Sequence, residues 1–339
     1  MRPIRVLVVD DSMMFRTMLV KGLNADPNIE VVAQAEDAYA ARDAIVKYKP
    51  DVMTLDVELP RMSGIEFLRR LMPQYPLPVV MISALSDKVF DALEAGAVDF
   101  VSKPDNLNAA QLNVFLTQEL AAKVKIASTA KVGKLKRVDT GTVLQHINTD
   151  QSRVVAIGAS TGGTEATFEV VKRFHRDIPG VVITQHMPPG FTQMYADRLN
   201  NQCEVAVKEA QTGDRVLPGQ VLIAPGDRHM RLVKVGGFYQ VECSGTDRVN
   251  GHCPSVDVLF SSVAKAVGKN AIGVILTGMG GDGARGLLEM RNAGAQTIGQ
   301  DEATCVVYGM PKVAYDLGAV QHRLAVTAIA GKVYSLLSK

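Results

Sequence analysis

The first 125 residues alternate short apolar runs with segments whose apolar positions recur at helical spacing. Five such alternations favour a doubly wound α/β fold with a parallel five-stranded, flavodoxin-like sheet, whose ligands bind at the carboxyl ends of the strands. The expected strands are Arg5–Asp10, Val31–Ala35, Asp51–Asp56, Pro78–Ala84 and Asp99–Lys103. The expected helices are Ser12–Ala25, Tyr39–Tyr48, Gly64–Met72, Lys88–Gly96 and Ala109–Lys125.

Polar residues stand where these strands end: Asp10 and Asp11, Asp56, Ser83, and Lys103. Carboxylates that converge on one edge repel each other, and a hard divalent cation such as Mg²⁺ relieves that repulsion. Asp56 is then the natural nucleophile for a phosphoryl group, with Lys103 and Ser83 available to its oxygens. Each residue alone is more often a helix cap or a surface turn, but the five together favour a phosphorylation site.

This set resembles a response-regulator receiver domain, and the resemblance covers residues 3–125. It implies that a histidine kinase phosphorylates Asp56. It also implies that Mg²⁺ is held by Asp10, Asp56 and the backbone carbonyl of Glu58, with Asp11 beside them. Phe100 stands where receivers place a switching aromatic residue, although ordinary core packing explains it equally well.

A linker is expected over residues 126–150, between a receiver domain at 1–125 and a second domain at 151–339. From Lys123 to Arg137 there are six basic residues and no acidic one, and residues 138–152 are polar. We interpret this composition as a helix tail that runs into a flexible connector, in preference to a docking segment.

The pattern of strand, turn and helix returns after residue 153. Val154–Gly158 leads to Ser160, Val181–Gln185 leads to His186, and Ile272–Leu276 leads to a Gly-rich turn with Asp282. In a mostly parallel sheet all three polar residues emerge at one edge. Between them, Val205 to Cys243 is expected to form short antiparallel pairs, with turns at Leu217-Pro-Gly-Gln and Val235-Gly-Gly-Phe.

Ser160, His186 and Asp282 have the chemistry of a catalytic triad. The imidazole takes the serine proton, and the carboxylate orients the imidazole and stabilises its charged form. The backbone N–H groups of Met279 or Thr161 could form an oxyanion hole. Other readings stay open, because His186 could be a turn residue and Asp282 a helix cap. The rival partners are His175, His229, His252 and Asp227, of which His229 is the strongest.

Six motifs of this region resemble CheB-type chemotaxis methylesterases. They are Gly158-Ala-Ser-Thr-Gly-Gly, Gln185-His-Met, Ile223-Ala-Pro-Gly-Asp-Arg-His, Pro254-Ser-Val-Asp-Val-Leu-Phe, Thr277-Gly-Met-Gly-Gly-Asp-Gly-Ala and Tyr308-Gly-Met-Pro. The resemblance implies that Ser160, His186 and Asp282 are nucleophile, base and orienting acid. It implies hydrolysis of glutamate methyl esters, and deamidation of glutamines, on chemotaxis receptors, under control of a CheA-type kinase. Cys253 occupies a position at which many members of that family carry a basic residue.

Composition narrows the remaining possibilities. A net charge of +2 predicts no nucleic-acid binding, and no apolar run reaches the ~18 residues of a membrane span. The four scattered cysteines fit reduced thiols in the cytoplasm, and the start of the chain predicts no signal peptide. We expect a monomer that needs no metal in its second domain. The alternative is a receiver joined to a partner-binding output domain without catalysis.

Overall fold

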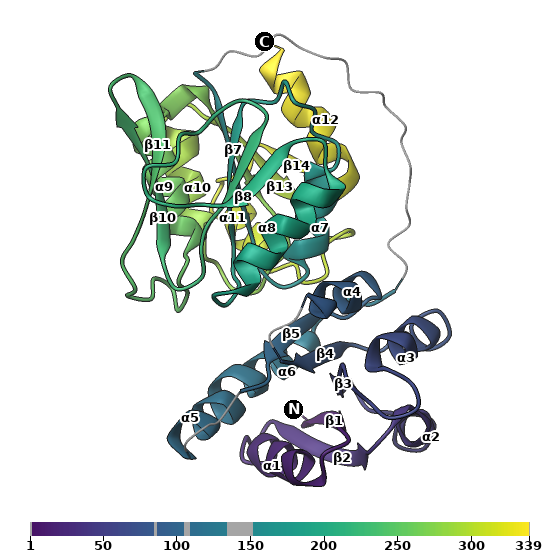
Figure 1. Cartoon of the computed structure of the whole chain (residues 1–339). Coiled ribbons are helices and arrows are strands. Elements are labelled where there is room, and N and C mark those ends of the chain that lie inside the picture. The colour runs from purple at the N-terminus through teal and green to yellow at the C-terminus, as the bar shows by residue number, and fades with distance from the viewer. Residues whose placement is uncertain (1, 85–86, 105–108, 134–151, 339) are drawn as a thin grey trace. The chain divides into compact units, whose positions relative to one another are not determined.

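The computed structural model describes residues 2–84, 87–104, 109–133 and 152–338. The chain forms two compact units, Met1–Leu135 and Lys136–Lys339, each drawn in Figure 1. Residues 134–150, most of the expected linker at 126–150, lie outside the described residues. In the part of the chain that is described, none of the helices combines the length and the apolar character needed to cross a membrane.

The first unit contains the five-stranded sheet that the alternating pattern predicts. All its neighbours pair in parallel, in the order β2-β1-β3-β4-β5. The register places Asp56 opposite Ile82, and Ser83 opposite Ser102, so these strand ends share one edge. The strands are Ile4–Val9 (β1), Ile29–Ala35 (β2), Val52–Asp56 (β3), Val79–Ser83 (β4) and Asp99–Ser102 (β5).

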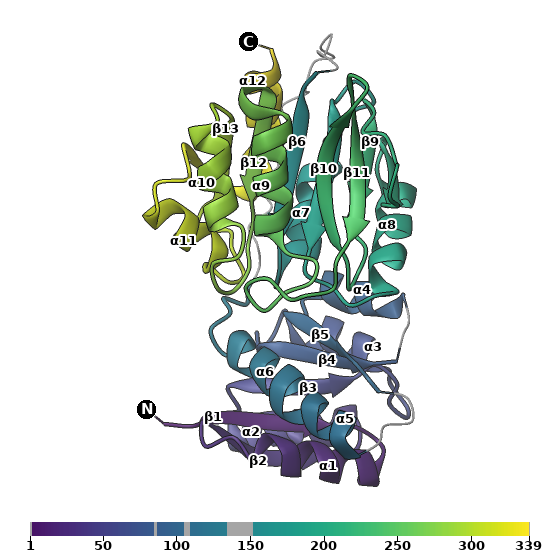
Figure 2. The same ribbon diagram turned by 90° about the vertical axis from the view of Figure 1, so that its left-hand side faces the viewer.

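Helices cover both faces of this sheet (Figure 2). Several begin at a capping residue whose side chain accepts a backbone N–H, as Ser12, Asp37 and Ser63 do. The helices are Met13–Leu23 (α1), Ala38–Tyr48 (α2), Gly64–Leu71 (α3), Lys88–Glu94 (α4), Ala109–Val114 (α5), a π-helical stretch Phe115–Leu120, and Ala121–Ala127 (α6).

The second unit is built on a seven-stranded parallel sheet in the order β14-β13-β12-β6-β7-β9-β8. From β6 the chain proceeds to β7 on one side, and later strands continue from β12 on the other. The carboxyl ends of β6 and β12 therefore form a topological switch point, where open α/β sheets bind ligands. The sheet strands are Val154–Ala159 (β6), Gly180–Gln185 (β7), Ala206–Glu209 (β8), Gln220–Ile223 (β9), Ala271–Ile275 (β12), Gln296–Gln300 (β13) and His322–Leu324 (β14).

Two helical layers enclose this sheet. Helices α7, α8 and α12 cover one face, and α9, α10 and α11 cover the other (Figures 1 and 2). The helices are Gly163–Val171 (α7), Phe191–Gln202 (α8), Val256–Ala266 (α9), the 3₁₀ turn Gly268–Asn270, Ala284–Asn292 (α10), Met310–Asp316 (α11) and Val326–Leu337 (α12).

Helix α9 approaches the sheet closely because two glycines leave room for it. A Cβ at Gly158 would lie 2.1 Å from Val256 Cγ1, and one at Gly283 would lie 2.4 Å from the same atom. Phe260 is fully buried in the same core. This packing holds the first turn of α9 against the loop that follows β12.

The middle of the second unit differs from its expected form. The turn at Val235-Gly-Gly-Phe does join an antiparallel hairpin, His229–Val235 (β10) with Phe238–Ser244 (β11). Strands β8 and β9, however, pair in parallel. The segment between β8 and β9 forms backbone hydrogen bonds with β11, from the Gly213 N–H to Val241 O and from the Val216 N–H to Tyr239 O. It therefore returns to the sheet in the same direction, and the turn at Leu217 to Gln220 closes no hairpin.

We predict that Phe260→Ala lowers the free energy of unfolding of the second unit by about 3–5 kcal/mol, because it leaves a cavity beneath α9. Phe238→Ala is the matched control, since that ring is 58% exposed and its loss should cost under about 1 kcal/mol. Hydrogen exchange of peptides from β6 and β12 during urea unfolding measures the free energy of unfolding of both variants. Equal losses would contradict this assignment of the core.

Candidate active site

Ser160 lies in a tight turn between β6 and α7. Gly162 has a φ of 72°, and a Cβ there would lie 2.6 Å from Val306 Cβ. The N–H of Gly163 donates back to the carbonyl of Ser160. The Gly-rich sequence is therefore required for the sharp reversal that puts a serine between a strand end and a helix N-terminus.

His186 follows the neighbouring strand at the same level. Ala159 pairs with Gln185, and the His186 N–H donates to the Ala159 carbonyl at 3.1 Å. Gln185 Nε2 donates to the Ser160 carbonyl at 2.9 Å and so ties the two strand ends together. The third strand end joins them, since Ser160 N–H donates to Thr277 O at 3.0 Å. These backbone contacts bring the serine and histidine side by side.

The imidazole of His186 is bound to Asp282 through one nitrogen. Nε2 lies 2.8 Å from Asp282 Oδ2, and the two side chains are 7% and 1% exposed. Nδ1 is buried and has no hydrogen-bond partner among the described residues. The carboxylate thus favours the tautomer with hydrogen on Nε2, which leaves Nδ1 as the nitrogen that can accept a proton.

Asp282 is a buried acid surrounded by donors. Ser255 Oγ and Asn250 Nδ2 each donate to Oδ1 at 2.8 Å, and the Val256 N–H donates to Oδ2 at 2.7 Å. Burial alone favours the neutral acid. The hydrogen bond and charge of His186, with donations from Asn250 and Val256, nevertheless hold the pKa of Asp282 well below its usual range. It is therefore an anion at neutral pH.

Three contributors to this environment, Asn250, Ser255 and Asp257, had no role predicted from the sequence, although the last two lie in the motif that begins at Pro254. Ser255 caps α9, and Asp257 accepts from Asn250 Nδ2 at 2.7 Å and from the Gly286 N–H at 2.7 Å. Burial raises the pKa of Asp257, and the charge of Asp282 adds to the rise. In residue terms this motif reads as the Ser-Val-Asp start of a helix, a common capping pattern that does not by itself indicate contact with Asp282.

The rival partners have other roles in the structure. His229 is buried with both nitrogens on the backbone, Nε2 at 2.7 Å from Asp247 O and Nδ1 accepting from the Ser255 N–H. His175 pairs with Glu204. His252 stacks on His186, with ring centroids 3.7 Å apart. Asp227 lies in the turn before β10 with a φ of 57°.

The two expected oxyanion donors belong to segments next to Ser160: Thr161 directly follows it, and Met279 lies on the turn after β12. Thr161 is buried, and its carbonyl accepts from Thr277 Oγ1 at 3.0 Å. Met279 is 43% exposed on the turn after β12, where Gly278 N–H donates to Val307 O. A Cβ at Gly278 would lie 2.7 Å from Ser160 Cβ, so this turn packs directly on the serine.

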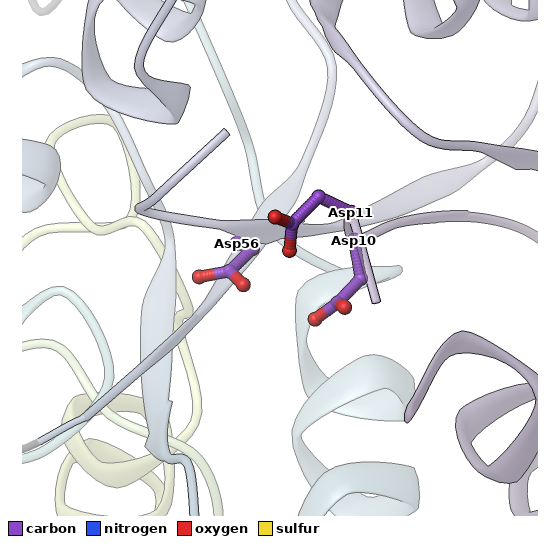
Figure 3. A group of neighbouring side chains, drawn as sticks. All are labelled: Asp10, Asp11 and Asp56. Carbon is purple, nitrogen blue, oxygen red and sulfur yellow. The ribbon is translucent and has the colours of Figure 1, made fainter. Parts of the chain in front are cut away.

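Three carboxylates gather at the strand ends of the first unit (Figure 3). Asp10, Asp11 and Asp56 each offer an oxygen, and these oxygens lie within 4.8 Å of one another. Asp10 and Asp56 are buried and Asp11 is exposed. Such a set of oxygen ligands open to solvent on one side suits a hard divalent cation.

Lys103 lies between two of these acids. Its Nζ is 3.0 Å from Asp10 Oδ2 and 2.7 Å from Asp56 Oδ2. Burial disfavours the charged amine, yet the two carboxylates raise the pKa of Lys103. Burial raises the pKa of Asp10 to about 6 in spite of Lys103, and the Asp56 charge contributes. One lysine therefore leaves this cluster short of positive charge.

The other expected residues of this site lie nearby or in the core. Ser83 is buried at the end of β4, and its hydroxyl donates to Ala84 O. The Glu58 N–H donates to Asp56 Oδ1, while the exposed Glu58 carboxylate lies 3.6 Å from Lys88. Phe100 is buried in β5, with Lys123 Nζ 5.4 Å from its ring centroid.

The second unit thus has a parallel α/β sheet with Ser160 and the His186–Asp282 pair at one edge, and the first has a parallel α/β sheet with an acidic cluster at its edge. Two family models match the chain: CheB methylesterase over residues 155–333 and response regulator receiver domain over residues 6–114. The chain belongs to the CheB methylesterase family and carries a receiver domain in its first unit.

Individual relatives agree with this placement. A protein-glutamate methylesterase/protein-glutamine glutaminase 2 from Syntrophomonas wolfei is 62% identical over 339 residues, covering 100% of this chain and 99% of the relative. A protein-glutamate methylesterase/protein-glutamine glutaminase from Syntrophotalea carbinolica is 56% identical over 350 residues, with coverage of 100% and 99%. The crystal structure of the Thermotoga maritima CheB methylesterase catalytic domain is 38% identical with a TM-score of 0.53, covering 54% of this chain and 98% of that one.

We predict that the stability conferred by Asp282 depends on pH. Folding lowers the pKa of Asp282, so its charge stabilises the fold above the unfolded pKa of about 3.9, and the contribution is lost as the pH falls through the folded value. The gap in unfolding free energy between wild type and Asp282→Asn should shrink as the pH drops below about 4. Urea unfolding from pH 7 to pH 3 measures this gap. A gap that widened toward low pH would contradict the prediction.

Proposed function

We propose that this chain is a phosphorylation-activated protein-glutamate methylesterase and protein-glutamine glutaminase that acts on methyl-accepting chemotaxis receptors. The observation that carries the proposal is the pairing of His186 with Asp282 on the sheet edge that also holds Ser160. The names of the full-length relatives support the substrate class.

In the proposed reaction Ser160 Oγ attacks the side-chain ester carbonyl of a receptor glutamate. His186 Nδ1 accepts the hydroxyl proton, and Asp282 stabilises the imidazolium from the Nε2 side. The N–H groups of Met279 and Thr161 receive the negative oxygen. The imidazolium then protonates departing methanol, and the same histidine activates water to release the acyl-enzyme. With a glutamine substrate, ammonia leaves from the same type of intermediate.

Control of this activity is proposed to come from the receiver domain. Asp56 accepts a phosphoryl group from a histidine kinase of the CheA type, with Lys103 and Ser83 contacting its oxygens and Phe100 responding to the change. Asp10, Asp11, Asp56 and the Glu58 carbonyl would hold Mg²⁺, which screens the charge of the incoming phosphoryl group. The close set of three carboxylates with one lysine supports this ligand set.

The proposal needs no metal in the second unit, because an imidazole supplies both base and acid for ester hydrolysis. It also expects a monomer that works in the cytoplasm and does not insert into the membrane or bind nucleic acid. Its domains are 1–125 and 151–339, joined by a linker at 126–150. A receiver with a binding-only output domain is the alternative, and the next experiment distinguishes the two.

We predict that Ser160→Ala lowers methanol release from methylated receptor membranes by more than about 10⁴-fold, because no other nucleophile replaces the hydroxyl. Ser335→Ala, exposed on α12, is the matched control and should keep full activity. Ammonia release measured in parallel reports on deamidation. If wild type releases neither product but binds the membranes, the output domain is a binding module.

We predict that a small phosphodonor with Mg²⁺ stimulates methanol release by wild type but not by Asp56→Asn, which lacks the phosphoacceptor oxygen. Asp43→Asn is the control, since Asp43 is exposed on α2 and forms an ion pair with its neighbour Arg42. It should respond like wild type. Stimulation of Asp56→Asn would place the phosphorylated residue elsewhere.

A further inference from the structure

Asn250 joins the carboxylate of the triad to a second buried carboxylate. Its Nδ2 donates to Asp282 Oδ1 at 2.8 Å and to Asp257 Oδ2 at 2.7 Å. We propose that Asn250 is a positioning residue of the hydrolase, whose amide keeps Asp282 ionised and aimed at His186 despite the carboxylate of Asp257 beside it. This inference rests on the proposed function of the second unit.

Asn250 is a donor that the two acids have in common. Asp257 also accepts from the Gly286 and Gly283 N–H groups, and it is 9% exposed. Its own backbone N–H donates to Asp282 Oδ1 at 3.3 Å, which fixes the two acids close together. A neutral amide with two N–H groups can satisfy one oxygen of each acid at once. Without it, the two anions would face each other with fewer donors, and one of them would take up a proton.

The turn that carries Asn250 also reaches the base of the triad. Val249 and His252 exchange both backbone hydrogen bonds, each at 3.0 Å, and Asn250 between them has a φ of 53°. Asparagine is among the side chains that best tolerate this left-handed conformation. The His252 ring stacks on His186 at an interplanar angle of 12°. One short turn therefore contacts both Asp282, through Asn250, and His186, through His252.

The titratable groups around Asp282 come from four segments. His186 follows β7 and Asp257 lies in the first turn of α9. His252, in the Val249–His252 turn, stacks on His186, and His229 at the start of β10 accepts from the Ser255 N–H. Protonation of Asp282 itself would remove the negative charge that faces His186 Nε2. Loss of the Asn250 amide should therefore reduce turnover, and more so as the pH falls.

The test uses full-length phosphorylated protein and measures kcat and KM for methanol release from pH 5 to pH 9. Asn250→Gly removes the amide but permits the same φ. We expect kcat to fall roughly 10²-fold with little change in KM, and the acidic limb of the profile to move to higher pH. Asn250→Asp, which adds a third carboxylate, should lose more activity. Asn292→Gly, exposed at the end of α10, is the control and should match wild type.

The double variant Asn250→Gly with Asp257→Asn separates electrostatics from structure. Removing the charge of Asp257 should restore much of kcat and return the acidic limb toward wild type. If Asn250→Gly behaves like wild type, or if its loss is independent of pH and is not rescued by Asp257→Asn, the proposal is wrong. Failure of the proposed function is a different result, because wild type itself would then release no methanol.

Discussion

Asp282 carries a negative charge with almost no access to water, and the second unit is arranged to keep it there. Burying such a charge is costly unless donors replace the lost water. Here the donors come from the first turn of α9, the Val249–His252 turn and His186. The close approach of α9 to Gly158 in β6 and to Gly283 before α10 brings the N-terminus of α9 to the acid.

In the receiver domain the buried carboxylates have fewer donors than Asp282 has. Asp10 and Asp56 share one lysine, and the third acid, Asp11, is exposed beside them. Compensation is incomplete, so the pKa of Asp10 rises rather than falls. An acid held in position by surplus donors suits a permanent role in orienting a base. An acid cluster that lacks positive charge suits reversible binding of a cation and a phosphoryl group.

Parallel strands provide the common framework for both sites. In each unit the candidate site residues stand at the ends of neighbouring strands, where the backbone hydrogen bonds of the sheet set their spacing. Ser160 and His186 are linked in this way through Ala159 and Gln185. Most of the candidate site residues are therefore placed by a strand end and the turn that follows it. The apolar residues inside the sheet and under the helices take no part in the sites and pack as the core.

The sequence by itself determined the strands of the first unit, the strand ends that carry Ser160, His186 and Asp282, and the family, because these depend on local periodicity and on motifs. It was wrong about β8 and β9, since the direction of a strand depends on where the connecting chain packs. Only the tertiary structure decided which nitrogen of His186 faces Asp282 and that both nitrogens of His229 are hydrogen-bonded to backbone groups. It also decided that Asn250 links Asp282 to Asp257. Those contacts join segments distant in the chain, and no local pattern encodes the packing that brings them together.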